Sequence, residues 1–76
     1  MPYTQDIVDE LKILAHYNLD STQEGVKIHS SADKQTIAAA QRLFDKGLTT
    51  QSDGGYLTSL GHSAAEHSTK LLQILD

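Results

Sequence analysis

The spacing of apolar and polar positions between residues 32 and 46 predicts an amphipathic helix. This stretch has no glycine or proline and includes three consecutive alanines, which favour helix strongly. Ser30 or Ser31 is suited to the N-cap position, and Gly47 follows the last turn, where glycine accepts the left-handed conformation that ends a helix. At about 100° per residue, one face gathers Ile37, Ala40, Leu43 and Phe44.

A second helix is predicted over residues 5–16, with Thr4 as its N-cap. Its apolar residues recur at helical spacing, and we expect this stripe to pack into the core. Ile13 lies outside the stripe, so it either covers a second neighbour or remains exposed. The stripe consists of Ile7, Val8, Leu11, Leu14 and Ala15.

A third helix is predicted over residues 59–75, capped by Thr58 or Ser59. Near its C-terminal end the apolar residues spread over an arc of roughly 160°, which is more than one small core needs. Either the first helix covers this arc within the monomer, or a second copy covers it in a homodimer. The dimer interface would then consist of Leu71, Leu72, Ile74 and Leu75.

Residues 48–58 predict a short β-hairpin between the second and third of these helices. Threonine, tyrosine and leucine flank a turn at residues 51–55, where Asp53, Gly54 and Gly55 suit the positive φ angles of a tight turn. Residues 21–28 allow two interpretations. We prefer a short helix capped by Asp20 or Ser21, which would complete a helix-turn-helix; the alternative is a strand over residues 26–28 that pairs with the hairpin.

The C-terminal half resembles a winged-helix DNA-binding domain. The matching residues are the Lys46-Gly47-Leu48 step, the wing around residues 53–55, and the Leu57-Thr58-Ser59-Leu60-Gly61 step into the next helix. These steps are similar to those of repressors of the multiple-antibiotic-resistance and phenolic-acid-regulator types. The wing departs from that pattern because it contains no arginine or lysine. The whole chain also resembles a small bacterial family that implies no function.

Length and composition limit the possible classes of protein. Seventy-six residues suffice for a single winged-helix-like domain, residues 1–76, with one modest core. The absence of cysteine excludes disulfides and thiolate metal sites. No apolar stretch has the roughly 20 residues needed to cross a bilayer, and the N-terminus does not resemble a signal peptide. We therefore expect a cytoplasmic protein without membrane contact.

No catalytic, metal-binding or cofactor-binding motif is recognisable. His62 and His67 are five residues apart, about 140° around a helix, whereas the zinc ligands of an HExxH helix are four apart. Phosphate-binding glycine loops, nucleophile motifs and paired carboxylates placed on an apolar cleft are also not recognisable in the sequence. We predict no enzyme activity, metal or cofactor.

The first functional hypothesis is a DNA-binding regulatory domain. The net charge of −4 argues against general affinity for nucleic acid, but four of the six basic residues lie between positions 27 and 46. The helix at residues 33–46 would enter the major groove of double-stranded DNA, and the wing at residues 51–55 would approach the backbone. The predicted contacts are Lys27, Lys34, Gln35, Gln41, Arg42, Lys46 and Ser52.

The alternative hypothesis is a protein-interaction module that binds no nucleic acid, because a winged-helix-like fold does not fix function. Its surfaces would be the acidic side chains of the first helix and the apolar arc of the last. The acidic surface would consist of Asp6, Asp9 and Glu10.

Overall fold

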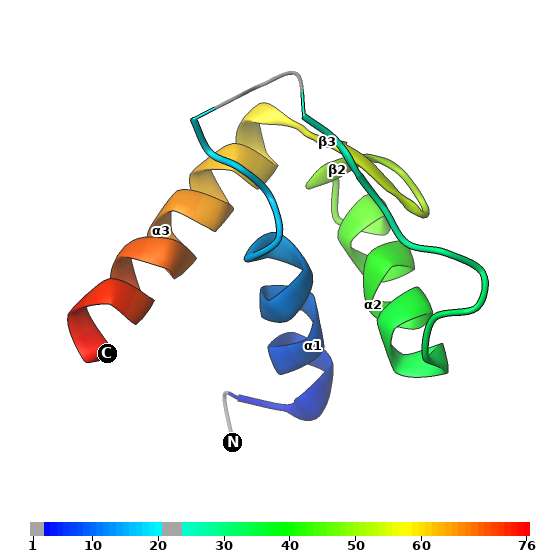
Figure 1. Cartoon of the computed structure of the whole chain (residues 1–76), viewed down its shortest axis with the longest axis horizontal. Coiled ribbons are helices and arrows are strands. Elements are labelled where there is room, and N and C mark those ends of the chain that lie inside the picture. The colour runs from blue at the N-terminus through cyan, green and yellow to red at the C-terminus, as the bar shows by residue number, and fades with distance from the viewer. Residues whose placement is uncertain (1–2, 21–23) are drawn as a thin grey trace.

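The computed structural model describes residues 3–20 and 24–76 and is mostly helical, with a small three-stranded antiparallel sheet. In Figure 1, α1 lies between α3 and α2, and the hairpin lies near the N-terminal end of α3. The elements in chain order are α1 (Gln5–Leu14), β1 (Val26–Lys27), α2 (Lys34–Asp45), β2 (Thr49–Gln51), β3 (Gly54–Leu57) and α3 (Ser59–Leu75).

The three predicted helices and the hairpin are confirmed, with small shifts at the end of α1 and at both ends of α2, which ends at Asp45 instead of residue 46. α1 ends at Leu14 instead of residue 16, because the N–H groups of His16 and Tyr17 donate to carbonyl groups three residues back and tighten the chain into a turn. α2 begins at Lys34 instead of residue 32. Its N-cap is Asp33, and neither Ser30 nor Ser31, because Ala32 N–H donates to the His29 carbonyl at 3.0 Å and closes a turn there.

The preferred short helix before α2 is wrong for residues 24–28, and the alternative strand is confirmed. β1 pairs antiparallel with β3, with Val26 opposite Gly55 and Lys27 opposite Gly54, which gives the sheet order β1-β3-β2. A Cβ atom at Gly54 would lie 2.3 Å from the Val26 carbonyl oxygen, so this pairing depends on glycine. Residues 24–33 therefore contain no helix that completes a helix-turn-helix; the proposed cap at Ser21 lies outside the described residues.

The core forms mainly where α1 packs on α2. Ala39 and Ala40 are fully buried, and their small side chains let α2 lie close to its neighbours, while Leu43 is the largest side chain that is completely enclosed. The buried apolar residues are Ile13, Leu14, Tyr17, Ala39, Ala40, Leu43 and Ala65.

α1 presents a different face to the core than the sequence predicts. Ile13 faces the core and is only 3% exposed. Of its two predicted alternatives, the first is therefore confirmed: Ile13 covers a second neighbour, which is α2. Of the predicted stripe, only Leu14 is fully buried. Ile7 is exposed. The other three stripe residues are at least partly exposed on the side of α1 that faces α3, and they are Val8, Leu11 and Ala15.

Candidate functional site on the first and last helices

α3 carries an apolar seam whose large side chains are exposed, while its one small member, Ala64, is partly buried and packs against the core. We call Leu60, Ala64, His67, Leu71 and Ile74 the α3 seam. Their spacing of 4, 3, 4 and 3 residues is that of the a and d positions of a heptad repeat, and at about 100° per residue they share an arc of about 80°. Leu60 is 59% exposed, Leu71 50% and Ile74 74%.

A separate face of α3 anchors the helix to the rest of the molecule. Gly61 and Ala65 are buried, and by the same count this face is centred about 120° from the α3 seam. Thr58 is the N-cap of the helix. Its Oγ1 accepts a hydrogen bond from Gly61 N–H at 3.0 Å and donates to the Gly47 carbonyl at 2.6 Å. Because the anchoring face is centred elsewhere on the helix, the large side chains of the α3 seam are exposed and can make another contact.

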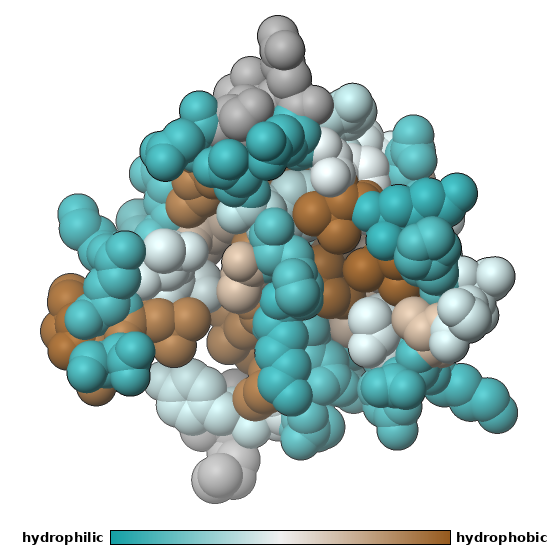
Figure 2. All heavy atoms as spheres, in the orientation of Figure 1, coloured by the Kyte–Doolittle hydropathy of each residue, from teal (hydrophilic) through white to brown (hydrophobic). Residues whose placement is uncertain are grey.

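An apolar groove of about 280 Å³ runs between α1 and α3, next to the α3 seam. Figure 2 shows brown, hydrophobic side chains at the C-terminal end of α3 and a hollow between this end and α1. Leu72 is 54% exposed at the groove, and Leu75 in the last turn is also largely exposed. The groove is lined by Val8, Leu11, Lys12, Ala15, Ser68, Leu71 and Leu72.

We call the α3 seam, Leu75 and this groove together the apolar face. The exposed parts of five large side chains on this face add up to the area of about three complete side chains. The five are Leu60, Leu71, Leu72, Ile74 and Leu75. Full burial of one such side chain contributes about 1.5–3 kcal/mol, so covering this area contributes about 5–9 kcal/mol. Monomeric proteins rarely leave so many large apolar side chains uncovered on one helix, which makes this face a candidate binding surface.

The two basic residues at the C-terminal end of α2 are held by α1. Glu10 is only 6% exposed, and its carboxylate accepts hydrogen bonds from Arg42 Nε at 2.9 Å and from Lys46 Nζ. Arg42 also donates to the backbone carbonyl of Asp6 at 3.2 Å. The prediction that Glu10 belongs to an exposed acidic surface of α1 is therefore wrong. Its carboxylate is buried between α1 and α2, where it pairs with two cations.

This ion-pair cluster shifts the pKa values of its members. Burial raises the pKa of Glu10, but hydrogen bonds and the nearby charges of Lys46 and Arg42 outweigh it and hold the pKa below its ordinary value. The hydrogen bond to Glu10 and the Asp6 charge together raise the pKa of Arg42 above its ordinary value. The cluster thus fixes α2 against α1 and occupies two of the cations predicted to bind DNA.

The other predicted DNA contacts do not form one surface. Lys34 is exposed at the start of α2, about 80° around the helix from Arg42. Gln35 lines a second groove, of about 480 Å³, between α1 and α2. Gln41 is exposed, but its Nε2 donates to Asp45 at 3.0 Å on the same face.

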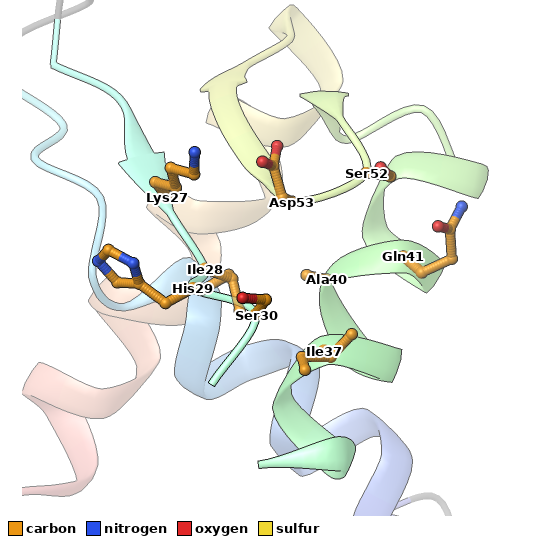
Figure 3. Close-up of a pocket in the computed structure, with 9 residues that line it drawn as sticks. All are labelled: Lys27, Ile28, His29, Ser30, Ile37, Ala40, Gln41, Ser52 and Asp53. Carbon is orange, nitrogen blue, oxygen red and sulfur yellow. The ribbon is translucent and has the colours of Figure 1, made fainter. Parts of the chain in front are cut away.

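Three of the predicted contacts border a hollow of about 410 Å³ between β1, the hairpin turn and α2: Lys27, Gln41 and Ser52. Figure 3 shows Lys27 on one side of this hollow and Gln41 and Ser52 on the other, with Gln41 directed away from Lys27. Asp53 also lies on the lining, together with the apolar side chains of Ile28, Ile37 and Ala40. A negative charge and apolar walls are poorly suited to holding a phosphate backbone.

The structure also shows where two of the histidines lie and whether its helices are suited to binding a metal ion or crossing a membrane. His62 Nδ1 lies 2.8 Å from Glu66 Oε1, and His67 is exposed on the α3 seam. Within residues 3–20 and 24–76, the structure holds no group of three or more metal-binding side chains. None of the helices in these ranges has both the length and the apolar character that crossing a membrane requires.

Sequence reasoning found most of the apolar face but not all of its members. The four residues predicted for a dimer interface, Leu71, Leu72, Ile74 and Leu75, are all at least half exposed. Leu60 was not included in that interface, although its heptad spacing from Leu71 and Ile74 was an available signal. The contribution of α1 was missed, because its apolar stripe was expected to face the core.

Together the fold and this surface define a small three-helix domain with a three-stranded sheet and an uncovered apolar helix face. The chain belongs to a family of unknown function (DUF5669), which matches residues 1–76. No curated protein and no solved structure matches the chain.

Proposed function

We propose that this protein is a small non-enzymatic interaction module that binds an amphipathic helix on its apolar face. The observation that carries the proposal is the exposure of the α3 seam, which is 74% at Ile74. Apolar side chains at this spacing are how one helix binds another by inserting side chains between those of its partner. We further propose that the module acts in the cytoplasm, which fractionation of the host cell tests.

The shape of the apolar face favours a helix over other ligands. The α3 seam follows a helix of 17 residues, which is about 25 Å long at 1.5 Å per residue. The groove between α1 and α3 lies beside it and gives a second row of apolar side chains, including Val8 and Leu11. A partner helix laid along this groove would be gripped from both sides.

The alternative function, DNA binding, has less support from the side chains. Arg42 and Lys46 already pair with the carboxylate of Glu10. To contact DNA phosphates they would have to give up this carboxylate, so they would exchange one anion for another. The outer side of α2 presents exposed Ile37 and Phe44 with Asp45, instead of a row of cations. Affinity for DNA comes largely from free lysine and arginine side chains that release counterions from phosphates.

A photo-reactive side chain placed at Ile74 in the living host tests the two functions together. We expect a protein adduct of defined mass that disappears when Leu71→Glu is added, because a carboxylate on the α3 seam opposes burial. The matched control carries the same photo-reactive side chain at Lys34, on the far helix, and should give no adduct.

Two results would contradict the proposed function. One is an Ile74 adduct that persists unchanged with Leu71→Glu, which would show that the α3 seam does not determine capture. The other is a nucleic-acid adduct at Lys34 together with no protein adduct at Ile74, which would favour the DNA-binding alternative.

A further inference from the structure

We propose that the helix bound to the apolar face is α3 of a second copy of this chain, packed antiparallel about a two-fold axis at His67. This inference rests on the proposed function and names its partner. A two-fold interface requires a surface that is complementary to itself, and the α3 seam meets that requirement.

The order of residues along the α3 seam is nearly the same when it is reversed about His67. In an antiparallel pair centred there, Leu60 lies opposite Ile74 of the second copy, and the two His67 side chains meet at the axis. Ala64 then lies within one residue of Leu71 of the second copy, so that a small side chain meets a large one. This alternation of small and large side chains lets two helices interdigitate without a cavity.

The charges near the α3 seam permit two copies to approach. The α3 seam contains no acidic residue, lysine or arginine, so the contact buries no fixed charge. Lys70, on the flank, faces the region of Ser63 and Ala64 in the second copy and not another lysine. Each copy carries a net charge of −4, and at about 0.1 M salt the repulsion between them is screened beyond about 10 Å.

The extent of the apolar face sets the expected affinity. The two copies together would cover an area equal to about five complete apolar side chains, contributed by the large side chains of the α3 seam and by the exposed Leu75 next to it. An interface formed by one pair of short helices lies at the small end of the range for specific contacts. We therefore expect a dissociation constant on the order of 1–100 μM.

Single cysteines test the pairing directly, because the natural sequence contains none. The variants are Leu60→Cys, His67→Cys and Ile74→Cys, all at exposed positions, with Lys34→Cys on α2 as the control. A disulfide, or a short linker between two thiols, forms only where the side chains meet. In the proposed register the two Leu60 positions are about 21 Å apart, the rise of 14 helical residues.

We expect His67→Cys to link to itself, and a mixture of Leu60→Cys and Ile74→Cys to link mainly as the mixed pair. Self-linking of Leu60→Cys at a level similar to His67→Cys would overturn the antiparallel arrangement. No linking above Lys34→Cys in any variant would overturn the second copy as partner. If the Ile74 adduct to a different protein nevertheless persists and depends on Leu71, the interaction module stands while this inference fails.

Discussion

Gly61→Ala is expected to destabilise the protein by at least about 3 kcal/mol, because the added methyl group has no space. A Cβ atom at Gly61 would lie 1.9 Å from the Leu48 carbonyl oxygen and 2.8 Å from its carbon. That carbonyl is fixed, since it also accepts a hydrogen bond from Thr58 N–H at 3.0 Å. Alanine is the better helix former by about 1 kcal/mol, so the clash must exceed this gain before any loss is seen.

Thermal unfolding followed by circular dichroism measures this effect. For a chain of this length, a loss of about 3 kcal/mol lowers Tm by roughly 12–24 °C. The matched control is Ser63→Ala, two residues further along α3 at an exposed position, which should change Tm little. A Gly61→Ala protein that melts within about 2 °C of this control would show that α3 does not approach residue 48 as described.

Glu10→Gln is expected to lower the free energy of unfolding at pH 7 by about 1–3 kcal/mol, the range for the loss of charge-assisted hydrogen bonds at a buried acceptor. The amide keeps the shape of the side chain but removes the charge that neutralises Arg42 and Lys46. Urea unfolding measures the loss. Asp45→Asn is the matched control, because Asp45 is exposed and accepts its hydrogen bond from the neutral amide of Gln41.

The effect of Glu10→Gln should depend on pH in a defined direction. The pKa of Glu10 is lower in the folded protein than its ordinary value of 4.5, so on acidification the unfolded chain takes up the proton first. Stability due to this carboxylate is therefore complete above pH 4.5 and is lost as the pH falls through the folded-state pKa. The difference between wild type and Glu10→Gln should shrink below that pH. A constant difference down to about pH 3 would contradict this account of the cluster.

Local sequence signals predicted the elements that depend on their own residues. α3 begins and ends where predicted, at Ser59 and Leu75, because Thr58 supplies a cap and no strong breaker interrupts the apolar spacing. The hairpin was predicted for the same kind of reason. Gly54 and Gly55 have φ angles of 116° and 74°, which glycine alone adopts readily.

β1 was harder to predict because its two residues owe their conformation to a partner. Val26 and Lys27 form a strand only by pairing with Gly55 and Gly54, which are distant in sequence. The local pattern was equally compatible with a short helix. Contacts between distant residues override weak local preference in this way.

The candidate site was only partly predictable for a related reason. The apolar side chains of α1 lie on two sides of the helix. Their spacing along the sequence does not show which side packs on α2 and which side faces α3. Glu10 lies on the same side of α1 as the buried Ile13 and Leu14, and its pairing with Arg42 and Lys46 holds that side of the helix against α2. A buried acid that needs two basic partners on another helix cannot be recognised from its own position in the sequence.

Sedimentation equilibrium of the full-length protein at about 0.15 M salt, near physiological ionic strength, tests most directly whether the apolar face binds a second copy. We predict that wild type and Lys34→Glu form a dimer with a dissociation constant on the order of 1–100 μM, and that Ile74→Glu remains a monomer while keeping its helical circular dichroism. A wild-type protein that stays monomeric at about 1 mM, or an Ile74→Glu variant that associates as wild type does, would contradict this account.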